Sequence, residues 1–361
     1  MVPKQKPPAD DELEVSVFGP GVGESVVIHT TGGRWMIIDS CEDRSGGVAP
    51  LAYLRQLGLD PAECVDWIVA THAHDDHVSG FAQVVAECAN AEVVLPAASD
   101  VVEFLAIEEI DKKLSFYDTR WTVYREYERV FAELKKPGRS VHYASAGTVL
   151  PLGVGNHAEP ILKLSFLAPS GYAIGLSKRA FAHLLRAAIQ SPGGRVSARD
   201  PNTFSIALLV TIGDFSVLLG GDVRRGTTQW GWRHIVANFP VDRPVTAHKI
   251  PHHGSKNAYE PQIWDQWLGA DCVNMLAPYR PSRLPRDDVV ALMASHRLPI
   301  WATAQSGELS ASAAVKTART MTRDVATRIE EDGGLMGQIR LRQRPGQSPK
   351  VSTLGPAFRL V

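Results

Sequence analysis

Residues 67–77 read WIVATHAHDDH, so a short apolar run leads directly into a dense group of histidines and aspartates. The run WIVA has the composition of a buried strand. His72, His74, Asp76 and His77 follow it within seven residues. Imidazoles and carboxylates are costly to bury at a strand end unless a cation holds them together. The segment therefore predicts a metal site where this strand ends.

The same arrangement recurs three more times along the chain. Asp39 ends the apolar run WMIID, and Asp222 ends SVLLGGD. His252 and His253 follow VTAHKIP and precede a glycine. Neutral imidazole and carboxylate are natural ligands of divalent ions. Four separate strands thus deliver His or Asp at their carboxyl ends, which predicts a metal centre assembled from strand-end loops.

The spacing within the cluster favours two divalent ions, Zn or Mn. His72 and His74 can reach one ion from a turn, while Asp76 and His77 point to a neighbouring ion. Asp222 is the expected bridge, because a carboxylate can bind two ions at once. Such a pair supplies a hydroxide near neutral pH and stabilises charge that develops on the substrate. We therefore expect a hydrolase that uses a metal-bridging hydroxide, with Asp76 and Asp222 in its catalytic set.

Strand-like and helix-like segments alternate along the chain. Leu13 to Ser40 reads as a three-strand meander. Helices are expected over Ala49 to Leu57 and from Gly80 to Cys88, where apolar residues recur at helical spacing. Two apolar runs joined at residues 213–214 predict a hairpin. Asp222 has a second interpretation, as the N-cap of a helix that starts at DVRRG.

Two insertions interrupt the alternation, a helical one at 99–140 and a polar one at 171–200. In the first, aromatic residues recur every three or four positions between arginines, which predicts a helix that packs its aromatic face on the body. A lid that stacks bases and contacts phosphates is the alternative. The aromatic residues are Trp121, Tyr124, Tyr127 and Phe131.

Composition limits the partners and the compartment. The chain has 38 Lys and Arg against 39 Asp and Glu, so its net charge is -1. It therefore lacks the overall positive charge that is typical of proteins that bind nucleic acid or an anionic membrane. No run approaches the ~18 apolar residues of a membrane span, and the N-terminus does not resemble a signal peptide. The four cysteines form no CxxC pair, which fits reduced thiols. We expect a cytoplasmic protein without membrane contact.

HAHDDH at 72–77 matches the HxHxDH signature of the metallo-β-lactamase fold. Asp39, Asp222 and the HHG histidines follow in the order that the other motifs of this fold require. The resemblance covers nearly the whole chain and implies an αββα sandwich over residues 12–361, with both insertions inside it. In this interpretation Asp39 orients the HAHDDH loop through hydrogen bonds and binds no metal.

Three further segments resemble the soluble domain of the ComEC-type competence DNA-uptake protein. They are NTFS at 202–205, VLLGGD at 217–222 and KIPHHGSK at 249–256. That branch is associated with nuclease activity, so the resemblance implies cleavage of DNA or RNA. We expect a free-standing relative without the membrane channel.

The resemblance also implies roles for individual residues. Related two-metal nucleases carry a ligand directly before glycine, which favours His253 as the ligand and leaves His252 to contact substrate. Lys256 is the expected proton donor or phosphate contact and Ser255 a substrate contact, although a solvated loop explains both equally well.

A third histidine usually stands between HxHxDH and the bridging aspartate of this fold. Asn202 occupies that place here and is expected to contact the ion or the substrate. His157 is the one histidine nearby, but it precedes the strand that such a ligand normally follows.

The sequence thus favours a metal-dependent phosphodiesterase, with nucleic acid as the expected partner. A small-molecule hydrolase acting on a lactone, a thioester or a cyclic nucleotide is the second interpretation. The third is a metal-binding partner protein of a defence or DNA-processing complex. GPGVGES at 19–25 reads as a hairpin turn, because it lacks the Lys-Ser/Thr end of a phosphate-binding loop.

Overall fold

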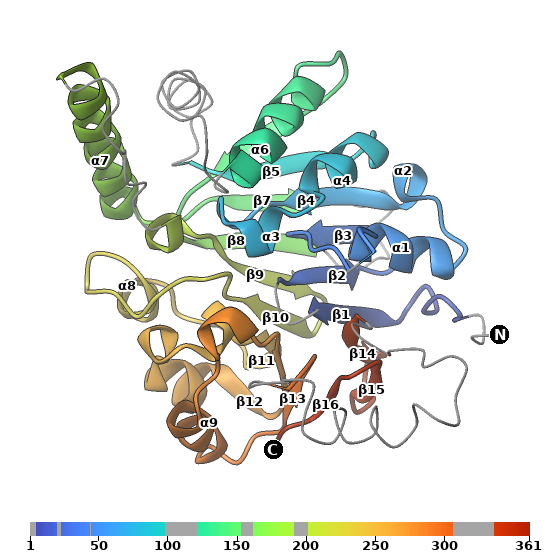
Figure 1. Cartoon of the computed structure of the whole chain (residues 1–361). Coiled ribbons are helices and arrows are strands. Elements are labelled where there is room, and N and C mark those ends of the chain that lie inside the picture. The colour runs from blue at the N-terminus through green and yellow to red at the C-terminus, as the bar shows by residue number, and fades with distance from the viewer. Residues whose placement is uncertain are drawn as a thin grey trace, which may run out of the picture.

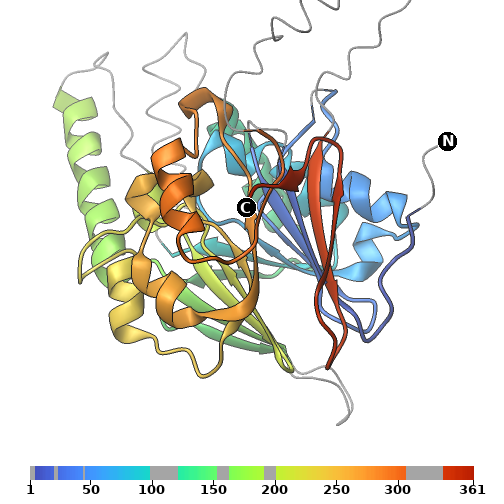
Figure 2. The ribbon, with the colours of Figure 1, turned by 90° about the horizontal axis from the view of Figure 1, so that it is seen from below.

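Two β-sheets face each other and carry helices on their outer faces (Figure 1, Figure 2). This architecture is seen in a computed structural model of the chain. The expected αββα sandwich is therefore confirmed. The structure describes residues 5–19, 23–43, 45–97, 121–152, 162–190, 201–305 and 336–361.

The first sheet has eight strands in the order β15-β14-β1-β2-β3-β4-β5-β6. Strands β1 to β3 pair antiparallel, as the predicted meander requires, and β3 to β6 pair parallel. The bounds are β1 Leu13–Gly19, β2 Ser25–His29, β3 Trp35–Ile38, β4 Val65–Val69, β5 Glu92–Pro96, β6 Val141–Ala144, β14 Gly337–Gln343 and β15 Lys350–Leu354.

The second sheet also has eight strands, in the order β16-β13-β12-β11-β10-β9-β8-β7. Its β9 and β10 form the predicted hairpin, and β10 to β13 pair parallel. The bounds are β7 Val149–Leu152, β8 Leu162–Ala168, β9 Ala207–Ile212, β10 Phe215–Leu219, β11 Val245–Lys249, β12 Leu268–Leu276, β13 Ile300–Ala302 and β16 Phe358–Arg359.

Helices cover the outer faces of both sheets and join successive strands. Helices α1 and α4 confirm the two helices that the sequence predicts over Ala49 to Leu57 and from Gly80 to Cys88. The bounds are α1 Ala49–Gln56, α2 Pro61–Cys64, α3 Asp75–Val78, α4 Phe81–Glu87, α6 Trp121–Leu134, α7 Gly171–Gln190, α8 Trp232–Asn238 and α9 Asp287–Ala294. Single turns follow at Pro201–Phe204, His252–Gly254, Lys256–Ala258, Ile263–Trp267 and Arg280–Ser282.

Three layers of apolar side chains hold the sandwich together. The central layer lies between the sheets and joins residues such as Val17, Val69 and Val217. One outer layer packs α1 and α4 on the first sheet, and the other packs α8 and α9 on the second. Strands buried on both faces read as continuous apolar runs, which is why WIVA and SVLL carry no alternation.

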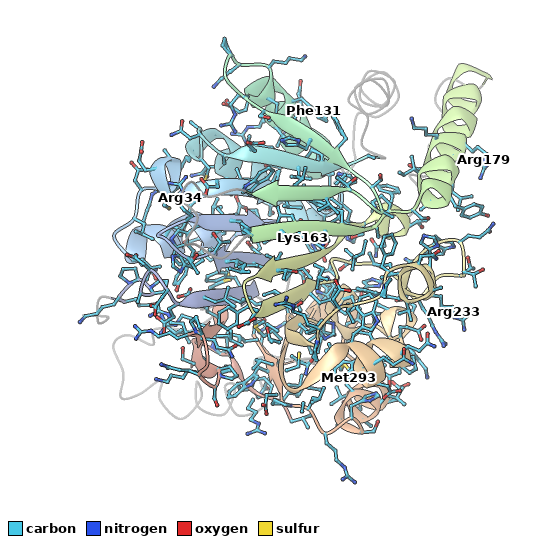
Figure 3. All side chains as sticks on the ribbon, turned by 180° about the vertical axis from the view of Figure 1, so that it is seen from behind. Arg34, Phe131, Lys163, Arg179, Arg233 and Met293 are labelled. Carbon is cyan, nitrogen blue, oxygen red and sulfur yellow. The ribbon has the colours of Figure 1, made fainter. Side chains whose placement is uncertain are left out.

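The described part of the helical insertion confirms the aromatic face of α6. Tyr127 and Phe131 are buried in the outer layer of the first sheet, and Figure 3 labels Phe131. Glu126 accepts a hydrogen bond at 2.9 Å from the backbone N of Ala82, in the first turn of α4. Residues 98–120 and the side chains of Trp121 and Tyr124 lie outside the described residues.

Two expectations of the sequence are corrected. Residues 171–200 were expected as a polar insertion, but 171–190 form the twenty-residue helix α7, which extends from the end of β8 (Figure 1). Asp222 does not cap a helix, because 223–231 form turns and α8 begins only at Trp232. An apolar stripe at helical spacing, with Ala173 and Ala180 buried, explains why α7 is a helix.

His248 on β11 is expected to make stability sensitive to acid. It is fully buried, its Nδ1 lies 2.9 Å from Asn274 Oδ1, and burial lowers its pKa from 6.5 to about 4. Below pH 6.5 the unfolded chain therefore binds a proton that the folded chain excludes. The free energy of unfolding should fall by about 3 kcal/mol between pH 6.5 and pH 4 through this group alone.

Urea unfolding at pH 7 and pH 4.5, compared between wild type and His248→Gln, measures this contribution. The variant should lose less stability on acidification than wild type, because glutamine has no proton to gain. The same loss in both proteins would contradict the assignment.

Candidate metal centre

The carboxyl ends of β3, β4, β10 and β11 bring the predicted polar residues together. Asp39 follows β3, the 72–77 segment follows β4, Asp222 follows β10, and His253 follows β11. The first two strands are parallel neighbours in one sheet, and the last two are parallel neighbours in the other. Strand ends that meet at one edge of the sandwich thus build a single site from both sheets.

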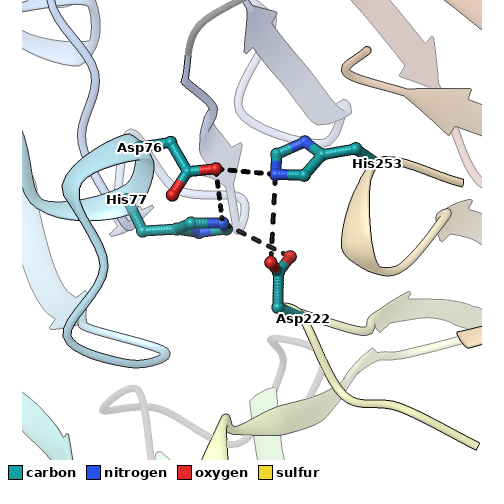
Figure 4. A group of neighbouring side chains, drawn as sticks. All are labelled: Asp76, His77, Asp222 and His253. Atoms are coloured by element: carbon teal, nitrogen blue, oxygen red, sulfur yellow. Dashed lines mark hydrogen bonds and ion pairs between the residues drawn. The ribbon is translucent and has the colours of Figure 1, made fainter. Parts of the chain in front are cut away.

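Four buried residues form what we call the inner cluster, namely Asp76, His77, Asp222 and His253 (Figure 4). His253 Nε2 lies 2.8 Å from Asp76 Oδ2, and His77 Nε2 lies 3.3 Å from Asp222 Oδ1. Each residue offers one ligand atom, and these atoms lie within 4.8 Å of one another. A single cation can therefore be reached by all four side chains.

His72, His74 and Asp222 form the outer cluster, again with ligand atoms within 4.8 Å. His72 is buried, and its Nε2 lies 3.8 Å from Asp222 Oδ2. The side chain of His74 is 43% exposed, so this cluster faces solvent. Asp222 belongs to both clusters, which is the position that the sequence predicts for a bridging carboxylate.

The hydrogen bonds of the imidazoles direct three Nε2 atoms into the clusters. His77 Nδ1 donates to Asp39 Oδ2 at 2.8 Å, and His253 Nδ1 donates to the carbonyl of Ala277 at 2.9 Å. The Nε2 atoms of His72 and His77 are buried without a hydrogen-bond partner. Metal-ligating histidines show this pattern, since the second nitrogen is held by an acceptor. The donor set therefore fits divalent metal ions.

Charge in the metal-free clusters is balanced by imidazolium. Burial lowers the pKa of His77, but the carboxylates of Asp222 and Asp76 outweigh it and raise that pKa well above its ordinary value. Burial raises the pKa of Asp222, yet His77 and His253 hold it well below its usual range. Ligands must shed protons before they bind a metal. Metal binding should therefore release protons from His77.

Asp39 has the geometry expected of an orienting residue. Its Oδ1 accepts from the backbone N of Thr71 at 2.7 Å, and its Oδ2 accepts from Thr71 Oγ1 at 2.7 Å as well as from His77. Thr71 Oγ1 in turn lies 2.9 Å from His72 Nδ1. One carboxylate thereby fixes the rings of His72 and His77, which stand in different clusters.

Gly221 makes the turn that delivers Asp222. Its φ is +48°, and a Cβ there would lie 2.6 Å from both Ser205 Oγ and the carbonyl of Ile206. Ser205 Oγ accepts from the backbone N of Asp222 at 3.0 Å. Position 221 of the GGD sequence therefore requires glycine, because its backbone is left-handed and its neighbours leave no room for a Cβ.

The remaining predicted residues lie around the outer cluster or beyond it. Asn202 Nδ2 lies 3.1 Å from His252 Nε2, which itself lies 3.7 Å from Asp222 Oδ2. The backbone N of Ser255 donates to the carbonyl of His252. Lys256 Nζ pairs with Asp288 at 2.9 Å on the surface. His157 lies outside the described residues.

Sequence reasoning missed Glu24, Lys249 and Thr71. Glu24 and Lys249 form a buried ion pair beside the inner cluster. Glu24 stands in the GPGVGES segment, which reads as a turn and of which residues 20–22 lie outside the described residues. The available signal was Lys249, a lysine inside the apolar strand VTAHKIP, because a buried lysine requires a partner.

Residues 18–105 match the model of the metallo-beta-lactamase superfamily. This range contains Asp39 and the 72–77 segment, which meet in the structure. Over this range the chain is similar to the metallo-beta-lactamase superfamily. Among curated proteins, none matches the chain. Within the described residues, no helix is long and apolar enough to cross a membrane.

Three solved structures resemble the chain at low identity. A metallo-beta-lactamase with a HARLDQ motif from Cronobacter sakazakii is 17% identical, with 57% of this chain and 59% of that chain covered and a TM-score of 0.30. A subclass B3 metallo-beta-lactamase from a soil metagenome is 13% identical, with 70% and 81% covered and a TM-score of 0.35. Zn²⁺-bound PqqB from Methylobacterium extorquens is 11% identical, with 77% and 85% covered and a TM-score of 0.41.

The two clusters are expected to bind metal with unequal affinity. The inner cluster offers four protein ligands, whereas the outer cluster offers two histidines and the shared Asp222. Fewer strong ligands give weaker binding. Calorimetric titration of the metal-free protein should show two steps separated by about tenfold or more, and His72→Gln should remove only the weaker one. Two equally tight steps would contradict this assignment.

Proposed function

We propose that the protein is a metal-dependent hydrolase of phosphodiesters. The observation that carries this proposal is the place of Asp222, whose carboxylate belongs to both ligand clusters. A carboxylate shared between two ligand sets suits two ions a few ångströms apart, an arrangement common to phosphatases and nucleases. Inner and outer clusters together would hold two divalent ions, Zn or Mn.

The side chains of the site would bind and orient the reacting groups. When bound, the two ions supply Lewis acidity and lower the pKa of water to near neutrality. Asp76 and Asp222 hold negative charge at the centre, which favours binding of these cations. His252 stands at the rim, with 13% of its side chain exposed and Nε2 facing Asp222. We assign His252, Asn202 and Ser255 to substrate contact.

Nucleic acid is the substrate we propose within this class. Support comes from the likeness of NTFS and KIPHHGSK to the ComEC-type competence protein, since both segments border the centre through Asn202 and His253. Arginines on α7 and α8, the helices that follow β8 and β10, add positive charge that could attract a phosphate backbone. Figure 3 labels two of them, Arg179 on α7 and Arg233 on α8, on the same side of the molecule.

A small-molecule substrate is the second candidate, and two ion pairs favour it. Lys256 is paired with Asp288, and Arg225 Nε lies 2.9 Å from Glu260 Oε2. Cations already balanced by carboxylates attract a polyanion less strongly. A cyclic nucleotide or a lactone needs fewer cations than a polynucleotide does.

One substrate panel separates these candidates. Purified protein is incubated with labelled single- and double-stranded DNA, RNA, cyclic dinucleotides and lactones, each with Mn²⁺, Zn²⁺, Mg²⁺ or a chelator. Phosphodiester cleavage that requires metal supports the proposal, and cleavage confined to lactones rejects it. No turnover of any compound would favour a metal-binding partner protein of a larger complex.

Lys256 is expected to protonate the leaving group. Its ion pair with Asp288 allows this role to be tested by changing either partner. General acids contribute roughly 10²-fold or more to the rate, so Lys256→Met should lower kcat by on the order of 100-fold on a substrate with a poor leaving group. On a substrate with a nitrophenolate leaving group, the same variant should show a much smaller decrease in kcat, because this leaving group needs no proton. Asp288→Asn frees the ammonium and should leave kcat equal or higher. Equal losses on both substrates would contradict the role.

A further inference from the structure

A buried ion pair lies against the inner cluster and has no role in the chemistry described so far. Lys249 Nζ contacts Glu24 Oε1, and their side chains are 2% and 3% exposed. Glu24 precedes β2 in the first sheet, and Lys249 ends β11 in the second. A buried ion pair gains little stability over apolar packing, so its position beside the ligands needs a reason.

Glu24 stands behind both imidazoles of the inner cluster. Its Oε2 lies 3.3 Å from His253 Nδ1, and its Oε1 lies 3.6 Å from His77 Nδ1. These are the nitrogens that face away from the ligand atoms. Glu24, Asp39 and His77 also form a third group of potential ligand atoms within 4.8 Å. The ammonium of Lys249 contacts this acidic group directly.

The same pair reaches the two carboxylates of the inner cluster through the backbone. The backbone N of Glu24 donates to the carbonyl of Asp76 at 2.9 Å. Lys249 Nζ donates to the carbonyl of Gly221, next to Asp222, at 3.4 Å. The pair therefore lies against all four residues of the inner cluster. Glu24 stands behind the rings of His77 and His253 and bonds to the backbone of Asp76, and Lys249 bonds to the backbone of Gly221, the neighbour of Asp222.

We propose that Glu24 and Lys249 are positioning residues for the inner metal ion. Glu24 places negative charge behind the Nδ1–H groups of His77 and His253, which donate to Asp39 and to the carbonyl of Ala277, and this charge makes each Nε2 a stronger ligand. Outer partners of this kind typically contribute about 10- to 100-fold to metal affinity. Lys249 balances the charge of Glu24 and ties it to the turn that carries Asp222. This inference rests on the metal centre of the proposed function.

A neutral double variant, Glu24→Gln with Lys249→Met, tests the role without leaving a lone buried charge. We expect calorimetry to show inner-ion binding weakened by about 10- to 100-fold, and the visible absorption bands of Co²⁺-loaded protein to shift. The matched control is Glu14→Gln with Arg342→Met, which removes a pair at 2.7 Å between the buried Glu14 of β1 and the partly buried Arg342 of β14. The control should unfold at lower temperature and keep wild-type Co²⁺ affinity and bands.

A charge swap, Glu24→Lys with Lys249→Glu, separates positioning from simple cross-linking of the sheets. The swapped pair can still join the sheets, but it places an ammonium behind the imidazoles, so inner-ion affinity should fall further. Wild-type Co²⁺ affinity and bands in the neutral double variant would overturn the inference. Wild-type protein that binds no metal would overturn the metal centre itself. Normal metal binding without phosphodiester cleavage would reject the proposed function alone and leave the positioning role standing.

Discussion

Asp222→Asn is expected to abolish hydrolysis and to reduce bound metal from two ions per chain to one or none. The change removes one negative charge from the only side chain that both clusters share. Asparagine also cannot bridge two cations as a carboxylate does. Loss of a preorganised electrostatic contact typically costs about 10²- to 10³-fold in kcat, and here the second ion is lost with it. Elemental analysis and turnover of the purified variant measure both effects.

Asp214→Asn is the matched control for this experiment. Asp214 stands at the turn of the same β9–β10 hairpin, and its side chain is 96% exposed. The same chemical change there should alter neither metal content nor turnover. Circular dichroism of both variants checks that the fold is kept. Full metal occupancy in Asp222→Asn would show that Asp222 is not the shared ligand.

Glutamine at His253 should weaken binding of the inner ion, whereas glutamine at His252 should leave it unchanged. His253 is buried with its Nε2 2.8 Å from Asp76, whereas His252 Nε2 faces Asn202 and the outer side of Asp222. We therefore expect His253→Gln to weaken inner-ion binding by on the order of 100-fold or more, because one of four strong ligands is lost. His252→Gln should keep the inner ion and raise KM or lower kcat.

The two histidines form a well-matched pair for comparison. Their φ angles are 49° and 52°, so the same substitution meets the same left-handed backbone at both positions. Any difference between the variants then reflects the side chain and not backbone strain. Calorimetric metal titration reports the affinities. If His252→Gln loses the inner ion and His253→Gln keeps it, the two roles are reversed.

The strand ends of this fold could be predicted from the sequence because a buried apolar strand is followed there directly by histidines and aspartates. WIVA and SVLL are almost wholly apolar, since β4 and β10 are covered on both faces, and the polar cluster begins where each strand ends. Asp39, Asp222 and His253 stand out for the same reason. The candidate metal ligands are thus visible as a break in composition, and the structure brings them into two clusters.

Other features depend on contacts between distant segments, which no local pattern reveals. Glu24 lies in a glycine-rich segment typical of a turn, and its partner Lys249 is 225 residues away in the other sheet. Thr71 looks like a strand residue until Asp39 is placed beside it. Helix α7 was missed because the interpretation of 171–200 rested on the polar, glycine-containing stretch SPGGRVSARDPN, although apolar residues recur at helical spacing over 171–190.

Anomalous diffraction from crystals of Mn²⁺- or Zn²⁺-loaded protein tests the metal centre most directly. Data collected on both sides of the metal absorption edge locate each ion without reference to the protein ligands. We expect two peaks, a strong one among Asp76, His77, Asp222 and His253, and a weaker one between His72, His74 and Asp222. The absence of anomalous density at the ends of β4 and β10, or peaks confined to another part of the chain, would contradict a two-metal hydrolase.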